Sequence, residues 1–386
     1  SVRKCGGKKS FFGSDGPYEF NSQDSLILSK VVREFLDGTM LEQCGEVSCV
    51  FQDTLKDELV SKAKFDSSKT RLVSACPLHV TIAWRMLMLK FISYFNTKRF
   101  DFEHGVGINV VSNQWAKLQS HLLKTSKSFL DGDLSGFDTS QHPDIQNMIF
   151  DELIGLLGIE SGPYASAINS LRSTYIRTTH ICGDEFYSWP GSLPSGHPLT
   201  ITFNCIYLSI AYRCAWVYNG GKLSDFRKQV NLIVYGDDSL CAIKPSSSDF
   251  FNHKTISRGM QSIGLTYTDA NKSEDLSLVD FKDINDVTFL KRSFKYHIDF
   301  GQVMAPLVLD TIKERVCWTF AKGDFMDLVQ SRCEDSILDL VLHGRDVWED
   351  LAPPIIQAFS KKFGKSLPHT TWELALLAVK QQVQNA

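Results

Sequence analysis

The segment "VYGDDSL" places two adjacent aspartates, Asp237 and Asp238, directly after a glycine. Short β-prone runs at 232–235 and 240–243 flank these residues, and Gly-Asp suits a two-residue connection, so the segment predicts a β-hairpin. The turn itself needs only one acid. Like charges held close together repel unless a cation lies between them. The segment alone therefore leaves two interpretations open, an ordinary hairpin and a hairpin that holds metal.

A second acidic segment, "DGDLSGFD", places Asp133 just after a short predicted strand at 128–130 and Asp138 five residues later. If this strand pairs with the hairpin, Asp133 and Asp237 face each other at one end of a sheet. Carboxylates so arranged can bridge two Mg²⁺ ions about 3.5–4 Å apart. Such a site suits phosphoryl transfer, because it can activate a hydroxyl and neutralise a leaving pyrophosphate.

Between these segments, "LPSGHPLTITFN" predicts a turn at Ser195 and a helix starting at Pro198. Thr200 and Asn204 are spaced i and i+4, so they share one helix face. A polar pair on an otherwise apolar helix indicates either a buried hydrogen-bond network or a ligand, and the spacing favours neither. His197 lies close to Ser195, but no acid is placed to orient it for nucleophilic catalysis.

The elements that position these residues predict an α+β protein. Helices are expected at 26–36, 77–99, 198–218 and 247–263, from Pro143 onward, and over most of the chain after 305. Strands are expected on both sides of "GDEF" (183–186) and near 287–304. The apolar face predicted for the helix from Pro143 comprises Ile145, Met148, Ile149, Leu153 and Leu156.

Composition indicates a globular chain of 386 residues, 43% hydrophobic and 22% charged, with two or three sub-domains. The net charge is −3, so affinity for nucleic acid has to come from local basic patches such as 3–9 and 56–71. The ten cysteines lack the spacing of a zinc site or a disulfide framework, which indicates a reducing compartment. No secretory signal is present, and the apolar run at 199–218 contains Arg213, so it predicts a buried helix and not a membrane span.

The order of six segments resembles the motif series F, A, B, C, D and E of picornavirus-like RNA-dependent RNA polymerases, which include dicistrovirus and calicivirus enzymes. The segments are "KDEL…KTR", "DLSGFD", "SGHPLTITFN", "YGDD", "DANKS" and "FLKRSF", and they cover 56–294. The resemblance implies a right-hand fold, with an antiparallel palm sheet flanked by helices and a mostly helical thumb. The implied boundaries are fingers 1–90 (incomplete) and 169–191, palm 91–168 and 192–304, and thumb 305–386.

The resemblance also implies residue roles. Asp133, Asp237 and Asp238 would ligate two Mg²⁺ ions, with Mn²⁺ as a substitute, and Lys272 would protonate the leaving pyrophosphate. Asp138 and Asn204 would bind the ribose 2′-hydroxyl, and basic residues would hold the triphosphate. The full implied set of nucleotide-binding residues is Asp138, Ser195, Thr200, Asn204, Lys56, Lys64 and Arg71. The implied primer contacts are Lys291 and Arg292.

The implied activity is template-directed RNA synthesis from ribonucleoside triphosphates on an RNA template and primer, in replication of a viral genome. The family further implies a genome-linked protein primer, other viral replication proteins and membrane-associated replication complexes in the host cytoplasm. A reverse transcriptase is an alternative, although such enzymes carry a bulky aromatic residue where Asp138 stands. An RNA-binding scaffold without catalysis is a second alternative.

Two features depart from the family pattern. Val60 stands where many relatives carry a basic residue, which questions that phosphate contact. The chain begins close to "GGKKSFFG", which follows a template-contacting segment in relatives. We therefore expect an N-terminally shortened chain. Outside the motif order, Lys272 would suit a solvated surface and 56–71 a solvated loop.

Overall fold

The structure is a computed structural model that describes part of the chain. The described residues are 22–37, 49–60, 62–66, 70–159, 161–273, 275–318 and 324–386. The basic residues at 3–9 and the segment "GGKKSFFG" lie outside them. The chain divides into two compact units, each of which we describe by itself. The first comprises 1–102, 135–211 and 261–266, and the second comprises 103–134, 212–260 and 267–386.

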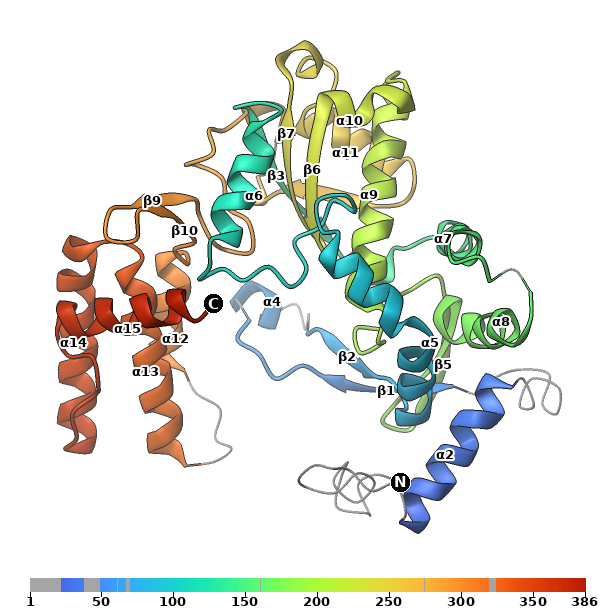
Figure 1. Ribbon diagram of the computed structural model, residues 1–386, viewed down its shortest axis with the longest axis horizontal. Coiled ribbons are helices and arrows are strands. Elements are labelled where there is room, and N and C mark those ends of the chain that lie inside the picture. The colour runs from blue at the N-terminus through green and yellow to red at the C-terminus, as the bar shows by residue number, and fades with distance from the viewer. Residues whose placement is uncertain are drawn as a thin grey trace. The chain divides into compact units, whose positions relative to one another are not determined.

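The first unit combines a four-stranded sheet with several helices (Figure 1). Its helices are α2 (Gln23–Leu36), α4 (Lys62–Asp66), α5 (Leu78–Thr97), η1 (Phe137–Thr139), α7 (Pro143–Leu156) and α8 (Pro163–Ile176). Its strands are β1 (Val50–Leu55), β2 (Leu72–Ala75), β4 (Arg177–Cys182) and β5 (Glu185–Pro190), in the order β2-β1-β4-β5. Strand β1 pairs antiparallel with β2 and parallel with β4, and α2 packs against α5 and α8.

The helices of this unit agree with the sequence in position and differ in detail. The predicted segment at 77–99 forms one helix, with Pro77 as its N-cap. Helix α7 starts at Pro143 as expected, and its predicted apolar face is correct at Ile149 and Leu153 but wrong at Met148 and Leu156, which are 52% and 75% exposed. Apolar periodicity does not count a buried glutamine, and here Gln146 occupies the inward face. The residues that α7 buries are Gln146, Ile149, Phe150 and Leu153.

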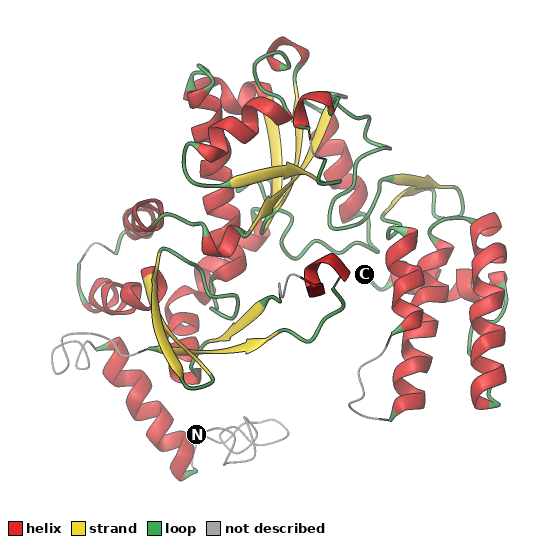
Figure 2. Ribbon diagram, turned by 180° about the vertical axis from the view of Figure 1, so that it is seen from behind, coloured by secondary structure: helices red, strands yellow, loops and turns green. Residues whose placement is uncertain are grey.

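The second unit contains a four-stranded sheet in the order β6-β7-β3-β8 (Figure 2). Its strands are β3 (Phe129–Ser135), β6 (Val230–Tyr235), β7 (Asp238–Ile243), β8 (Thr266–Asp269), β9 (Lys295–His297) and β10 (Gln302–Met304). Helical elements before the C-terminal helices are α6 (Gln114–Leu123), η2 (Leu223–Asp225), α10 (Phe226–Gln229), η3 (Pro245–Ser247), α11 (His253–Gln261) and η4 (Leu276–Leu278). Helix α9 (Thr200–Tyr218) begins in the first unit and ends in the second.

The pairing expected between the hairpin and the strand before Asp133 is confirmed. Strands β6 and β7 form the hairpin, and β7 pairs antiparallel with β3, with Gly132 opposite Ser239. Strand β3 extends to Ser135. Asp133 therefore lies within the strand, whereas the sequence predicted that it follows the strand. Pairing within the sheet, where β3 lies between β7 and β8, overrides the weak strand propensity of Asp and Gly.

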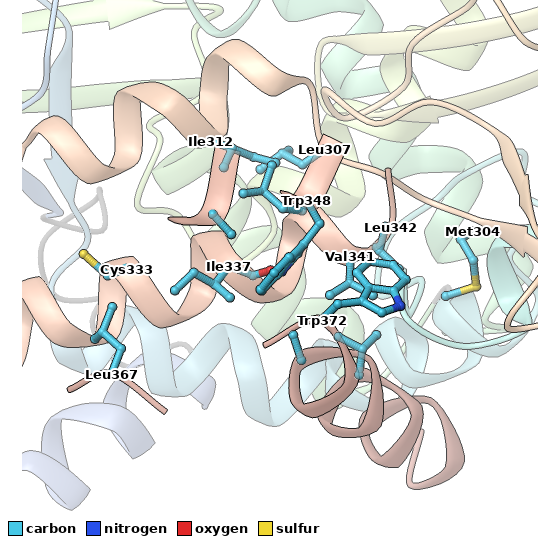
Figure 3. Packing of buried hydrophobic residues seen from close by; sticks show 14 of the residues in the cluster. Met304, Leu307, Ile312, Cys333, Ile337, Val341, Leu342, Trp348, Leu367 and Trp372 are labelled. Atoms are coloured by element: carbon cyan, nitrogen blue, oxygen red, sulfur yellow. The ribbon is translucent and has the colours of Figure 1, made fainter. Parts of the chain in front are cut away.

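The described elements from Leu309 onward are all helices. They are α12 (Leu309–Cys317), α13 (Phe325–Val341), α14 (Arg345–Phe363) and α15 (Trp372–Gln384). Their buried side chains form one cluster (Figure 3). In it the ring centroids of Trp348 and Trp372 are 6.1 Å apart, and Ile337 is fully buried. The α+β fold class and the helical C-terminal part are thus confirmed, whereas the predicted subdomain boundaries stay a prediction.

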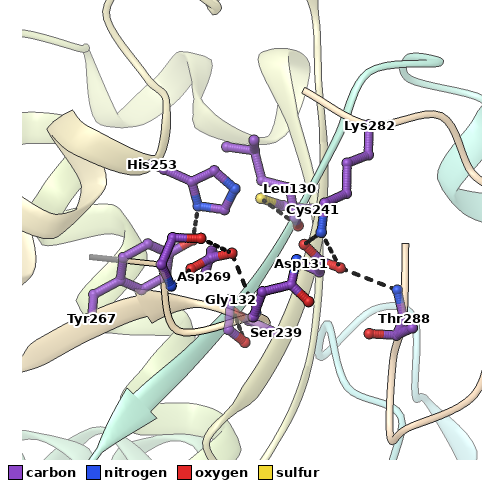
Figure 4. Close-up of polar contacts among 12 residues, drawn as sticks. Leu130, Asp131, Gly132, Ser239, Cys241, His253, Tyr267, Asp269, Lys282 and Thr288 are labelled. Atoms are coloured by element: carbon purple, nitrogen blue, oxygen red, sulfur yellow. Dashed lines mark hydrogen bonds and ion pairs between the residues drawn. The ribbon is translucent and has the colours of Figure 1, made fainter. Parts of the chain in front are cut away.

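A buried ion pair anchors β3 within the second unit. Asp131 is 1% exposed, and the Lys282 ammonium lies 2.7 and 3.0 Å from its two carboxylate oxygens (Figure 4). The Thr288 amide donates to the same carboxylate at 3.1 Å, and Lys282 exchanges both backbone hydrogen bonds with Phe129. A buried carboxylate that loses its cation keeps its desolvation cost without the compensating attraction. The position of β3 therefore depends on this pair.

Replacing Lys282 should destabilise the protein strongly. We expect Lys282→Met to lower the free energy of unfolding by about 3–5 kcal/mol, because Asp131 would stay buried without its cation. The measurement is the melting temperature by circular dichroism. Lys228→Met is the matched control, because its ammonium contacts the exposed Asp225 at 2.8 Å and such pairs contribute about 0–1 kcal/mol. Equal losses in the two variants would contradict the anchoring role.

Candidate active site

Three aspartates meet at one end of the second unit's sheet, and we call them the carboxylate cluster: Asp133, Asp237 and Asp238. Tyr235 pairs with Asp238, so the connection has two residues, Gly236 and Asp237. Gly236 has φ +66°, the left-handed conformation that a type II′ hairpin requires at this position. The apolar residues on both sides are buried, which fixes the register and places the acids at the tip.

Burial and the neighbouring acids together set the electrostatics of this cluster. Burial, followed by the charges of Asp237 and Asp133, raises the pKa of Asp238 to about 7. The charges of Lys291 and Lys272 act in the opposite direction without cancelling it. The Lys272 ammonium lies 3.0 Å from a carboxylate oxygen of Asp133. The cluster is therefore an acidic centre whose charge the neighbouring lysines compensate only in part.

The donor set of the carboxylate cluster fits a hard divalent cation. Carboxylate oxygens are the ligands that Mg²⁺ prefers, and a cation would relieve the repulsion that contributes, after burial, to the raised pKa of Asp238. Among the residues that the structure describes, no three His, Cys, Asp or Glu side chains already form a group able to hold a metal ion. The types of these residues fit a divalent cation.

A chain of buried amides lies in the first unit, and we call it the amide relay: Gln146, Gln141 and Asn204. The Gln146 amide donates to Gln141 at 3.2 Å, and the Gln141 amide donates to Asn204 Oδ1 at 2.6 Å. Asn204 Nδ2 then donates to Asp138 Oδ1 at 2.8 Å. Both partners of Asn204 select the same amide orientation, with its donor group toward Asp138. No motif or spacing in the sequence predicts a role for Gln141 or Gln146.

The other predicted residues of the α9 segment are hydrogen-bonded locally. Thr200 Oγ1 donates to the carbonyls of Pro194 and His197, both at 2.8 Å. Ser195 Oγ accepts from the Ser74 amide at 3.2 Å, which ties the turn to β2. The structure thus contains the hydrogen-bond network that was one of the two interpretations of the Thr200–Asn204 pair.

His197 is a core histidine. Burial lowers its pKa to about 3, so the ring is neutral at physiological pH. Its ring packs against Trp84 and Tyr175, and its Nδ1 accepts from the Leu199 amide at 3.2 Å. These contacts agree with the absence of a nucleophilic role in the sequence interpretation.

Two of the predicted triphosphate-binding cations converge on one acid that sequence reasoning missed. Glu58 lies 2.9 Å from the Lys56 ammonium and 3.7 Å from the Arg71 guanidinium. Burial raises the pKa of Asp138, and the Asn204 hydrogen bond and the charge of Arg71 partly oppose that rise. Arg71 is thus electrostatically coupled to Asp138. The backbone of Lys64 lies in α4, but its side chain is outside the described part of the structure.

The segment "FLKRSF" forms a tight hairpin in the second unit, where Phe289 and Arg292 exchange both backbone hydrogen bonds. Lys291 is exposed at its tip with φ +57°. The Arg292 guanidinium points elsewhere, because it donates to the Ala305 carbonyl at 2.7 Å and lies 3.8 Å from Asp339. Of the two predicted primer contacts, Lys291 is therefore the more accessible.

Comparison with known proteins now adds to this geometry. The family model described as viral RNA-dependent RNA polymerase matches residues 14–334. The chain belongs to this polymerase family. The predicted family is thereby confirmed.

Relatives of this polymerase chain include replicase polyproteins of insect viruses. The chain is 32% identical over 368 residues to that of cricket paralysis virus, covering 90% of the chain and 20% of the polyprotein. It is 31% identical over 372 residues to that of Drosophila C virus, covering 92% of the chain and 21% of the polyprotein. The chain thus spans about a fifth of the length of these curated relatives.

The fold is similar to that of a solved viral polymerase. The structure described as Sicinivirus 3Dpol RNA dependent RNA polymerase matches with a TM-score of 0.80 at 23% identity, covering 98% of this chain and 75% of the other. This likeness confirms the predicted polymerase fold class. Among the helices that the structure describes, none combines the length and the apolarity needed to cross a membrane.

Neutralising Asp138 should stabilise the protein at neutral pH. Because the pKa of Asp138 is raised in the folded state, its ionised form opposes folding at any pH above that pKa. We expect Asp138→Asn to raise the melting temperature at pH 7, and the gain to disappear below about pH 3.8, where the carboxyl is protonated in both states. Calorimetry between pH 3 and pH 8 measures this, with the exposed Asp184→Asn as control. A gain that persists at low pH would contradict the assignment.

Proposed function

We propose that this chain catalyses template-directed RNA synthesis as a nucleotidyltransferase. The 3′-hydroxyl of a primer forms a bond to the α-phosphate of a ribonucleoside triphosphate, and the bond to pyrophosphate breaks. The observation that carries this proposal is the carboxylate cluster at the β6–β7 hairpin, with Lys272 3.0 Å from Asp133. Membership of the viral RNA-dependent RNA polymerase family supports it.

Asp133, Asp237 and Asp238 would hold two Mg²⁺ ions, with Mn²⁺ as a substitute. When bound, such ions stabilise negative charge on the attacking and the leaving oxygens. The three carboxylates supply hard oxygen ligands, and their repulsion opposes assembly unless positive charge is present. The Lys272 ammonium lies 3.0 Å from a carboxylate oxygen of Asp133, beside the acids that would hold the ions. From this position it would supply a proton to the leaving pyrophosphate.

The first unit would contribute recognition of the nucleotide. Asp138 keeps acceptor capacity beyond its bond from Asn204, and Asn204 Nδ2 keeps a second hydrogen, so the pair can bond a ribose 2′-hydroxyl. Lys56 and Arg71 would hold the triphosphate, and both now share Glu58, which keeps them close together. Lys64, Ser195 and Thr200 would assist, and Lys291 and Arg292 would contact the primer. An RNA-binding scaffold without catalysis is the competing function.

By analogy with the family, we also propose a genome-linked protein as primer, other viral replication proteins as partners, and membrane-associated replication complexes in the host cytoplasm. The similarity to replicase polyproteins supports a role in replication.

Primer extension tests the proposed activity. Wild-type protein should extend an RNA primer on an RNA template with ribonucleotides and Mg²⁺. We expect Asp237→Ala to lower the rate at least about a hundredfold, because it removes a metal ligand worth several kcal/mol in the transition state. Asp225→Ala is the control, since the Asp225 carboxylate contacts the surface cation Lys228 at 2.8 Å, away from the carboxylate cluster. RNA binding without extension by wild-type protein would favour the scaffold.

Sugar selectivity tests the role of Asn204. We expect Asn204→Ala to lower the preference for ribo- over deoxyribonucleotides by about 10–100-fold, because one hydrogen bond to the 2′-hydroxyl is lost. The readout is the ratio of kcat/KM for the two nucleotides. Asn219→Ala is the matched control, because the Asn219 side-chain amide donates hydrogen bonds to the backbone carbonyls of Ala215 and Thr255. An unchanged ratio in Asn204→Ala would exclude Asn204 from ribose recognition.

A further inference from the structure

Asp269, the last residue of β8, has an unusual environment for an acid. Asp269 is 0% exposed and lies beside Tyr267 (Figure 4). Among the residues that the structure describes, its hydrogen-bond donors include no side-chain cation. Its carboxylate accepts from the Ser273 amide at 2.6 Å, the Ser273 hydroxyl at 3.0 Å and the Asn271 amide at 3.2 Å. These donors are the residues on either side of Lys272. Asp269 therefore closes a loop around the lysine that faces the carboxylate cluster.

The loop around Lys272 holds a conformation that a lysine does not favour. Lys272 has φ +57°, in the left-handed region, which is unfavourable for a residue that carries a Cβ. The Lys272 amide donates to the Asp269 carbonyl at 3.0 Å, which completes the turn. Hydrogen bonds to the Asp269 side chain offset this strain, so the turn depends on that carboxylate.

The turn is also fastened to β3, which carries Asp133. The Ala270 amide donates to the Asp131 carbonyl at 3.1 Å, and the Thr268 hydroxyl donates to the Asp133 carbonyl at 3.5 Å. With the backbone fixed at both ends, the Lys272 side chain starts from a defined point, and its ammonium reaches Asp133 at 3.0 Å. A change in the geometry of this turn would move the backbone position from which the Lys272 side chain extends.

Asp269 remains a charged acceptor despite its burial. Burial raises its pKa, but the hydrogen bonds from Ser273 and Asn271 outweigh that effect, and the pKa is lowered overall. Hydrogen bonds to an ionised acceptor are stronger than those to a neutral one. The carboxylate is thus suited to hold the two backbone amides rigidly.

We propose that Asp269 is a positioning residue, which fixes the strained 269–273 turn so that the Lys272 ammonium is presented to the carboxylate cluster. The inference rests on the proposed function, because the placement of Lys272 matters for catalysis only if the chain transfers nucleotides. It assigns a role to a residue outside the set that the motifs imply. A purely structural Asp269 would instead affect stability alone, or all kinetic steps together.

Single-turnover nucleotide addition on preformed enzyme–RNA complexes distinguishes these roles. We expect Asp269→Ala to lower the rate constant of addition about 10–100-fold and to leave the nucleotide Kd unchanged, because a displaced catalytic group slows chemistry and not binding. Lys272→Ala should cost about a hundredfold or more, as loss of a proton donor does. The double variant should be no slower than Lys272→Ala alone. Asp269→Asn, which keeps an acceptor oxygen, should recover part of the rate.

Asp275→Ala is the matched control. Asp275 accepts from the Ser277 amide at 2.8 Å and the Ser277 hydroxyl at 2.6 Å, so it caps the next turn with the same chemistry without contacting the loop of Lys272. Its addition rate should equal that of wild type. If Asp269→Ala does not fold, Ser273→Ala replaces it, because it removes only the hydroxyl bond, and its smaller loss should also vanish in the Lys272→Ala background.

Three results would overturn the positioning role: independent, multiplicative losses from Asp269→Ala and Lys272→Ala, a weakened Kd with an unchanged rate constant, or no effect of Lys272→Ala. Each of these requires an active wild-type enzyme, so they leave the proposed polymerase function standing. A wild-type protein without any nucleotide addition would refute the polymerase function, and the inference with it.

Discussion

Burial of neighbouring acids at the tip of the β6–β7 hairpin is the constraint on which the arrangement of this site depends. The hairpin and its pairing with β3 bring Asp133, Asp237 and Asp238 near one another, and burial, followed by the charges of Asp237 and Asp133, raises the pKa of Asp238. Backbone pairing and buried apolar flanks have to supply the opposing stabilisation. An acidic site is therefore built into a part of the sheet where its charge opposes folding.

Two further buried acids keep this arrangement in place by different means. Asp131 is compensated by the Lys282 cation, which ties β3 to the segment before the "FLKRSF" hairpin. Asp269 is compensated by backbone amides, which shape the turn that carries Lys272. A cation pair holds two segments together, whereas amide donors define a local backbone conformation. Asp131 is part of β3, and Asp269 is part of the neighbouring strand β8. The positions of Asp133 and Lys272 are therefore fixed relative to the same strand.

Much of this could be predicted from the sequence, because the catalytic-type residues lie in short local patterns. The hairpin around Asp237, the helix from Pro143 and the strands around "GDEF" each have local signals, and the structure contains all three. The extent of β3 could not be predicted, because it depends on pairing with two strands, β7 and β8, that lie more than a hundred residues away. Nor could the face of α7, since the buried Gln146 amide donates both to Gln141 and to the Ser192 carbonyl. Asp269 had a local signal, an aspartate placed two and four residues before potential donors in "TDANKS", which is typical of a side chain that caps a turn.

Asp138 in the first unit is also a buried acid, and among the described residues its direct hydrogen-bond partner is the neutral Asn204 and not a cation. Asp138 is held by the Asn204 amide, and the Arg71 charge reaches it electrostatically, so burial still leaves its pKa raised. A carboxylate paired tightly with arginine would have its acceptor positions occupied and its charge neutralised. Neutral dipoles aligned through the amide relay orient Asn204 and Asp138 while leaving acceptor capacity available. The proposed recognition of a ribose 2′-hydroxyl would need this difference: oriented donors and acceptors, and no strong ion pair that the incoming hydroxyl would have to break.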